Sequence, residues 1–489
     1  NATVQNLTFD NASFSSSQVY AGILASQASN ATISNITIND SNVIANWNAG
    51  LVIGVLQDSV LSNINITGTS SLTGNNSLGG IAGVTKGAVS ILGSSSVAQV
   101  TGTNSTGGLV GYVESGVLTL KNDVVSGDVI GNSGVGGLVG STNRRLTASI
   151  SNSSTTGAVS GTKRVGGILG SGGATIKDSF TTGKVMGTAE EVGGLAGYID
   201  EGGITDSYAT GDITGTQTVG GIAGYGRDIS GSYATGNVSG TNYVGGLFGN
   251  AYRVSNSYAT GNVTGSGNYV GGLGGSGSST LATNYASGTV KGVSYVGGLF
   301  GSNNGTITDS TVKASGQVSG SGEFIGGLAG ISGSNSYSSP SISNSNSMAS
   351  VSGADGSKQV GGLVGASYGT VTNSNSTGLV TVGTNAFAVA GLMGANYGTL
   401  SNDTNNTSSV VAGTGGEALG TLLGLHSDVE NGSLSTGTLT INNLLVSTPE
   451  RIGLQYTDGI IRTAKQLAYV NYFSKNNYTL ANDIDMAGV

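Results

Sequence analysis

The chain contains no cysteine, one histidine, one tryptophan and two prolines in 489 residues. The absence of cysteine excludes a disulfide scaffold, a cysteine-ligated zinc site and a thiol nucleophile. A His-Glu-x-x-His metal site needs two histidines, so it cannot form around the single His426, which we expect on a surface loop. The scarcity of proline and the lack of a strict Gly-X-Y period exclude collagen.

Charge is also scarce, because charged residues make up 9% of the chain against about 25% in average proteins. Lys and Arg number 17 and Asp and Glu 25, for a net charge of −8, which argues against a basic nucleic-acid surface. No apolar run approaches about 18 residues, so we expect no segment that spans a bilayer. Hydrophobic residues form 37% of the chain, which disfavours disorder.

Glycine, in contrast, is abundant, with 89 residues. Many glycines lie in a recurring phrase, Val-Gly-Gly-Leu-x-Gly, as in residues 192–197. The glycine before the Leu or Ile recurs 15 times between Gly22 and Gly420, with a mean step of about 28 residues. A fixed period of this length is typical of solenoids.

One period, residues 203–224, contains three short apolar segments rich in Val, Ile, Thr and Tyr, separated by Gly, Ser, Thr or Asn. Such segments suit strands and are too short for helices. The sequence therefore predicts an all-β fold, a parallel β-helix (β-solenoid) of about 15 coils with three short strands per coil. Glycine would supply turns with positive φ and allow close packing of neighbouring coils.

Three regions are expected along the chain. Residues 1–79 form irregular N-terminal coils, residues 80–447 form the regular repeat solenoid, and residues 448–489 form a cap or the start of another module. A short amphipathic helix is expected over residues 463–473. Because the chain begins at Asn1 without Met or a signal peptide, it looks like a piece of a longer exported protein.

The core phrase, followed by Ile-x-Asp/Asn-Ser-Tyr-Ala-Thr-Gly, resembles the GLUG repeat. The resemblance is good from about Gly80 to Gly394 and looser in residues 1–79 and 395–447. GLUG repeats occur in very large bacterial surface proteins, including filamentous-haemagglutinin-like adhesins, and in non-catalytic regions of some IgA-specific metallopeptidases. The resemblance implies a stalk or adhesive region and carries no catalytic residues.

Acidic residues recur at one position of the repeat. Asp178 and Asp206 occupy it on adjacent coils, and two carboxylates at such a distance are what glycoside hydrolysis uses. Elsewhere the same position is mostly Asn, and a ladder of Asp and Asn side chains capping a turn explains the whole set. We therefore expect no enzyme activity, no cofactor and no metal. The remaining members are Asn122, Asn152, Gly231, Asn256, Thr283, Asp309, Asn346, Asn373 and Asn402.

Aromatic residues line up in two columns. The first column lies two residues after the acidic position, and the residue that follows it is nearly always small, which predicts an outward aromatic and an inward small neighbour. The second precedes the Val of the core phrase, and its equivalents Arg164, Glu191, Thr218 and Gln359 indicate exposure. The first column is Phe180, Tyr208, Tyr233, Tyr258 and Tyr285; the second is Tyr243, Tyr269, Tyr295 and Phe324.

Two interpretations of these columns remain open. Stacked aromatics stabilise a sheet by about 0.2–1 kcal/mol for each pair between coils. Alternatively, the columns form a flat amphipathic stripe that stacks on sugar rings or is buried by a protein partner.

Nineteen Asn-x-Ser/Thr sequons are candidate glycosylation sites. Their alternative explanation is chance combined with the preference of Asn for turns. They are Asn1, Asn6, Asn11, Asn30, Asn35, Asn39, Asn65, Asn75, Asn104, Asn152, Asn237, Asn262, Asn304, Asn375, Asn402, Asn405, Asn406, Asn431 and Asn477.

These observations together predict an extracellular adhesin or stalk segment, secreted or held at a bacterial cell surface. Its expected partners are glycans or proteins of host or neighbouring cells, with self-association of the solenoid as a further expectation and nucleic acid excluded. The alternatives are a non-catalytic region of a large secreted peptidase and a polysaccharide-degrading β-helix.

Overall fold

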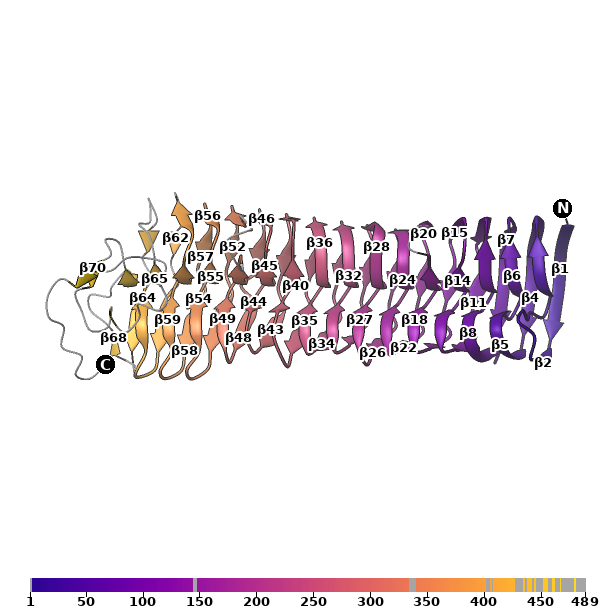
Figure 1. Cartoon of the computed structure of the whole chain (residues 1–489), viewed down its shortest axis with the longest axis horizontal. Helices are drawn as coiled ribbons and strands as arrows, with labels where there is room; N and C mark the ends of the chain where they lie inside the picture. The colour runs from indigo at the N-terminus through magenta and orange to yellow at the C-terminus, as the bar shows by residue number, and fades with distance from the viewer. Residues whose placement is uncertain are drawn as a thin grey trace. The chain divides into compact units, whose positions relative to one another are not determined.

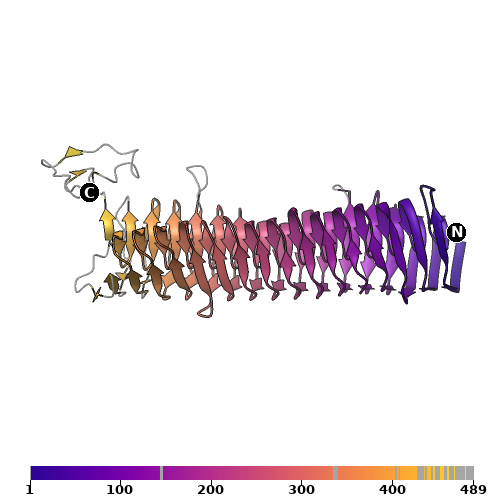
Figure 2. The same ribbon diagram turned by 90° about the horizontal axis from the view of Figure 1, so that it is seen from below.

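The computed structural model describes residues 2–143, 147–333, 340–401, 405–406, 408–426, 434–435, 438–441, 444–445, 452–455, 460–461, 467 and 479–480. The chain divides into two compact units, Asn1–Ser266 with Gly272–Ser276, and Gly267–Gly271 with Gly277–Val489. Within each unit, β-strands of successive coils lie side by side and parallel (Figure 1), and the view in Figure 2 shows the same stacking. The predicted all-β parallel solenoid is confirmed, with about 14 turns against the expected 15.

One coil of the first unit illustrates the architecture. Its strands are β28 (Ala196–Thr205), β29 (Tyr208–Ala209), β30 (Ile213–Thr214) and β31 (Gln217–Gly220). The first two belong to one sheet and the last two to another, and each pairs in register with the next coil, as in Tyr208 with Tyr233. The coil thus has four strand segments rather than three, because the left-handed Asp206 (φ 49°) interrupts the chain between β28 and β29.

The N-terminal coils have longer strands than this. Strand β1 (Ala2–Asp10) pairs in parallel with β4 (Ala31–Asn39), which pairs with β7 (Val60–Thr67). On the other sheet, β5 (Asn42–Gly50) pairs with β8 (Ser71–Gly79), and β8 with β13 (Asn104–Gly107). These coils are therefore stacked in register like the regular ones.

The second unit repeats the same plan. Its strand β49 (Glu323–Gly326) is followed by β50 (Ala329–Ser332), β51 (Ser341–Ser343), β52 (Asn346–Ser347) and β53 (Ser350–Gly353). The division between the units falls inside the expected 80–447 array, and the boundaries at 79 and 447 stay predictions. His426 ends strand β65 (Leu423–His426), so the prediction that it lies on a loop is wrong. Except for Leu467, the expected helix over 463–473 lies outside the described residues.

The core phrase builds the interior of both units. Val192 and Leu195 have no exposed surface, and their counterparts in neighbouring coils are equally buried. Gly193 and Gly194 lie where neighbouring coils approach closely, since a Cβ on Gly194 would lie 2.0 Å from the carbonyl oxygen of Gly221. Burial of one Val and one Leu or Ile in each coil gives a continuous apolar column.

The expected role of glycine needs one correction. Among the described residues, positive φ is adopted by far more Asn, Asp and other side-chain-bearing residues than glycines. The glycines of the core phrase are not in that region; they are required because a Cβ there would collide with backbone of the same or a neighbouring coil. Close approach, rather than turn geometry, therefore explains most of the glycine in the repeat.

A column of buried serines turns the corner after the acidic position. The backbone N–H of Ser179 donates to Ser207 Oγ at 3.1 Å, and the Ser179 hydroxyl donates to the Lys177 carbonyl at 2.7 Å. The same pair of bonds recurs in successive coils of the first unit, so each serine satisfies buried backbone groups. Asp123, with no exposed surface, takes the place of serine between Ser94 and Ser153, as Asn284 does before Ser310 in the second unit.

Candidate binding surfaces

The first aromatic column is a stack of rings in the first unit, on β25 (Phe180–Thr181), β29, β33 (Tyr233–Ala234) and β37 (Tyr258–Ala259). Successive ring centroids are 4.9 Å apart, with interplanar angles of 1°, 5° and 1°. The neighbours Thr181, Ala209, Ala234 and Ala259 are buried and the rings half-buried, so the small residues face inward as predicted and the rings lie on the outer face of the strands. We call Phe180, Tyr208, Tyr233 and Tyr258 the aromatic stripe.

The parallel rings of the stripe cover one another's faces. Tyr208 lies between Phe180 and Tyr233, and Tyr233 between Tyr208 and Tyr258. The stripe therefore presents ring edges and hydroxyls, which favours coil-to-coil stabilisation over face stacking on sugars. Desolvation, followed by the neighbouring Tyr258 and Tyr208, raises the pKa of the Tyr233 hydroxyl above its ordinary value.

Tyr285, the fifth residue of the predicted column, belongs to the second unit. There it pairs in register with Thr311 on the next coil. The Lys313 ammonium lies 3.7 Å from the centroid of its ring, a cation–π contact.

The second aromatic column is half-buried rather than exposed. In the second unit, Tyr269, Tyr295 and Phe324 stack at 4.5 and 4.8 Å. Tyr243, in the first unit, shares their left-handed conformation, with φ of 53°. The prediction of exposure is wrong for the equivalent Gln359, which is 6% exposed. The left-handed backbone directs these side chains into the corner between the two sheets. There Gln359 donates to the Tyr397 hydroxyl at 3.1 Å.

The acidic position is a left-handed ladder, as the turn-capping interpretation requires. Asp178, Asp206, Asn256 and Asp309 have φ near 50°, and Asp178 and Asp206 are exposed. The expectation of no enzyme activity stays a prediction.

One coil was misaligned in the predicted column. Thr311 pairs with Asn346, and Asn346 with Asn375, so Asn346 belongs to the aromatic column and the left-handed Asn344 takes the acidic position. The sequence Asn-Ser-Asn-Ser fits both registers, which differ by two residues. Asn402 lies outside the described residues.

The sequons differ in accessibility. Asn35 Nδ2 donates to Asn6 Oδ1 at 3.0 Å, and a glycan on Asn35 would leave this nitrogen a single N–H. Asn39, Asn65, Asn304 and Asn375 are half-buried. Asn1, Asn402, Asn431 and Asn477 lie outside the described residues, and the side chains of Asn405 and Asn406 are not described. The exposed members are Asn6, Asn11, Asn30, Asn35, Asn75, Asn104, Asn152, Asn237 and Asn262. Glycosylation stays a prediction.

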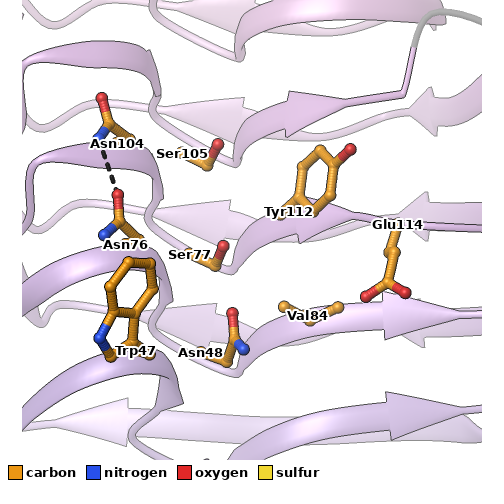
Figure 3. A pocket seen from close by; sticks show the side chains of 9 residues that line it. All are labelled: Trp47, Asn48, Asn76, Ser77, Val84, Asn104, Ser105, Tyr112 and Glu114. Atoms are coloured by element: carbon orange, nitrogen blue, oxygen red, sulfur yellow. Dashed lines mark hydrogen bonds between the residues drawn. The ribbon is translucent and has the colours of Figure 1, made fainter. Parts of the chain in front are cut away.

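A hollow of about 390 Å³ in the first unit was not predicted. It lies in the concave corner between the two sheets, lined by Trp47, Asn48, Asn76, Ser77, Val84, Asn104, Ser105, Tyr112 and Glu114 (Figure 3). Trp47 is 51% exposed. Trp47 is the only tryptophan of the chain, and this was the one signal in the sequence that pointed to the site.

The described residues offer neither a metal site nor a membrane-spanning helix. No group of three or more His, Asp or Glu side chains in the described ranges is placed to hold a metal ion. Within the same ranges, no helix has the length and apolar character needed to cross a membrane.

Comparison with known proteins identifies the repeat. The family model of the GLUG motif matches residues 188–214. This range contains β28 and β29, and with them Asp206 of the acidic position and Tyr208 of the aromatic stripe. The chain therefore carries a GLUG motif, and the resemblance stated from the sequence is confirmed there. No curated protein matches significantly, and no solved structure does.

Proposed function

We propose that the chain is an attachment and spacer segment of an extracellular bacterial surface protein. The observation that supports this most is the repetition of outward columns on a backbone held in register by parallel ladders. A repeat stack contacts only its neighbouring coils, so it extends by addition of coils and presents the same surface many times.

The aromatic stripe is the surface proposed to make the attachment. Its ring edges are apolar and three of its four members carry a hydroxyl, so it can be buried by a protein or glycan while its polar atoms keep hydrogen bonds. The rings are already ordered by mutual stacking, so little side-chain freedom is lost when a partner binds. The GLUG motif at 188–214, within the same coils, agrees with a surface protein.

Replacing Tyr208 and Tyr233 together with serine tests the stripe. Ser154 occupies the same column on β21 (Ser154–Thr155) and pairs with Phe180, so the fold accepts serine there. We expect cell attachment of the purified chain, measured by flow cytometry over a concentration series, to weaken about tenfold, equivalent to 1.4 kcal/mol.

The matched control removes a different stacked pair. Tyr198 and Tyr225 also stack at 4.9 Å, and their column contains Ser171. The double serine variant therefore removes one stacked contact elsewhere, against the three that Tyr208 and Tyr233 make. It should keep full attachment. If the stripe variant lowers the melting temperature but attaches as well as the parent and the control, the stripe is only structural and the proposal fails.

A further inference from the structure

We propose that the Trp47 hollow is a binding site for an uncharged oligosaccharide. The inference does not depend on the aromatic stripe, which lies on other coils of the same unit. It rests on the arrangement of rings, amides and hydroxyls in the hollow and on the absence of unpaired charge among its described residues.

Three successive coils form one wall of the hollow. Trp47 pairs in register with Asn76, and Asn76 with Asn104, on β5, β8 and β13. The next residue of each strand, Asn48, Ser77 or Ser105, is left-handed, with φ between 43° and 52°. These short side chains form the floor between Trp47 and Tyr112 (Figure 3).

The opposite wall lies on β9 (Ala82–Lys86) and β14 (Val110–Val113), where Val84 pairs in register with Tyr112. On the following coil the same corner is filled by Ser141. Its Oγ lies so near Gly134 that a Cβ on this glycine would be only 2.1 Å away. Farther along, the Arg164 guanidinium fills the corner 5.1 Å from the Tyr198 ring centroid. The hollow is therefore a local feature of the coils that carry Trp47 and Tyr112.

The two rings of the hollow differ from those of the stripe. In the described part of the chain, no aromatic ring stacks on Trp47 or Tyr112, so no other ring covers their faces; Trp47 is 51% exposed and Tyr112 half-buried. They lie two coils apart, roughly 10 Å along the stack, which is too far for one pyranose ring to cover both. This spacing suits separate sugar units of one chain, each with a C–H face against an aromatic ring.

The polar groups match sugar hydroxyls. Asn104 Nδ2 donates to Asn76 Oδ1 at 2.7 Å, and this bond holds the two amides side by side. The Asn104 carbonyl oxygen and the Asn76 amide hydrogens point away from this bond (Figure 3). Amides and serine hydroxyls both donate and accept, as sugar hydroxyls do. A few polar groups on an aromatic-lined surface are typical of small-ligand sites.

Charge selects against an ionic ligand. Glu114, the acidic residue of the lining, pairs with Lys86 at 3.0 Å, so the site has no net charge. An apolar peptide would leave the amide ladder unsatisfied, which costs free energy. A neutral saccharide carries no charge and supplies hydroxyls that can hydrogen-bond to the amides.

The only tryptophan of the chain provides the assay. Short linear oligosaccharides of glucose, mannose, galactose and N-acetylglucosamine are titrated into the full chain, produced without glycosylation because Asn104 is itself a sequon. We expect at least one series to change Trp47 emission saturably, with an affinity that does not depend on salt. Charged oligosaccharides and apolar peptides are titrated in parallel.

Substitutions then locate the site. On an array of the same oligosaccharides, Trp47→Ala and Tyr112→Ala should each weaken binding about tenfold or more, whereas Trp47→Phe should retain most of it. Tyr252→Ala removes an aromatic that is 45% exposed elsewhere on the unit and should bind normally. The proposal is overturned if no neutral oligosaccharide changes the emission, if only charged saccharides or peptides do, or if Trp47→Ala binds undiminished.

Discussion

Replacing Gly221 with alanine is expected to disrupt the coils on both sides of it, lowering the free energy of unfolding by more than about 4 kcal/mol. A Cβ at this position would lie 2.0 Å from the carbonyl oxygen of Gly246 and 2.6 Å from Ala234 Cβ. The carbonyl belongs to the backbone of the next coil, so relief requires the coils to separate. Chemical denaturation and limited proteolysis would measure the loss, with new cleavage expected near residues 221–246.

Gly356→Ala is the matched control. This glycine has φ of +69° and nothing within 4 Å of a Cβ, so its replacement adds only left-handed strain of about 1–2 kcal/mol. If both variants lose the same free energy of unfolding, close approach of the coils is not the reason for the glycines of the core phrase.

The second large effect is a pH dependence caused by Asp123. Burial raises the pKa of its carboxyl to about 7, although the backbone N–H groups of Ser94 and Lys121 donate to it and oppose the rise. In the unfolded chain the same group ionises near 3.8. Between these values the folded state holds the extra proton, so the free energy of unfolding should fall as pH rises from about 4 to about 7, then level off. A difference of about 3 pKa units corresponds to about 4 kcal/mol.

Asp123→Ser should remove this dependence. Serine is the usual residue of the buried column, and Ser153 on the next coil shows the bonds it would make, with its hydroxyl donating to the Ser151 carbonyl at 2.8 Å. Denaturation of both proteins at pH 4.5 and pH 8 would test this, with the variant more stable than the parent at pH 8. Asp309→Asn, an exposed acid replaced by a residue common in its column, is the control. An equal pH slope in parent and Asp123→Ser would contradict the assignment.

The sequence predicted what depends on period and size. The 28-residue recurrence and short apolar segments were sufficient for the parallel solenoid, and the small residues after Phe180 and Tyr208 were sufficient to orient those strands. These inferences succeed because backbone pairing repeats in every coil. Alternation between the two faces of a strand then assigns each neighbouring residue.

What could not be predicted depends on backbone angles and on distant coils. Tyr295 and Phe324 are left-handed although such residues rarely adopt positive φ, so nothing in their identity indicated a half-buried corner. The Trp47 hollow requires short side chains at Ser77 and Ser105 and an aromatic at Tyr112, residues that come together only once the register of three coils is fixed.

Disulfide trapping tests most directly the register on which both binding surfaces depend. Thr214 and Ser239 pair across adjacent coils with their hydroxyl oxygens 3.3 Å apart, and the chain has no other cysteine to interfere. Cysteines at both positions should oxidise readily, as seen by non-reducing peptide mapping. Ser239 pairs onward with Thr264, so Thr214→Cys with Thr264→Cys places the sulfurs two coils apart, roughly 10 Å, too far for a disulfide. Cross-linking of the first pair alone is the predicted result; failure of that pair, or equal cross-linking of both, would contradict the stacked columns.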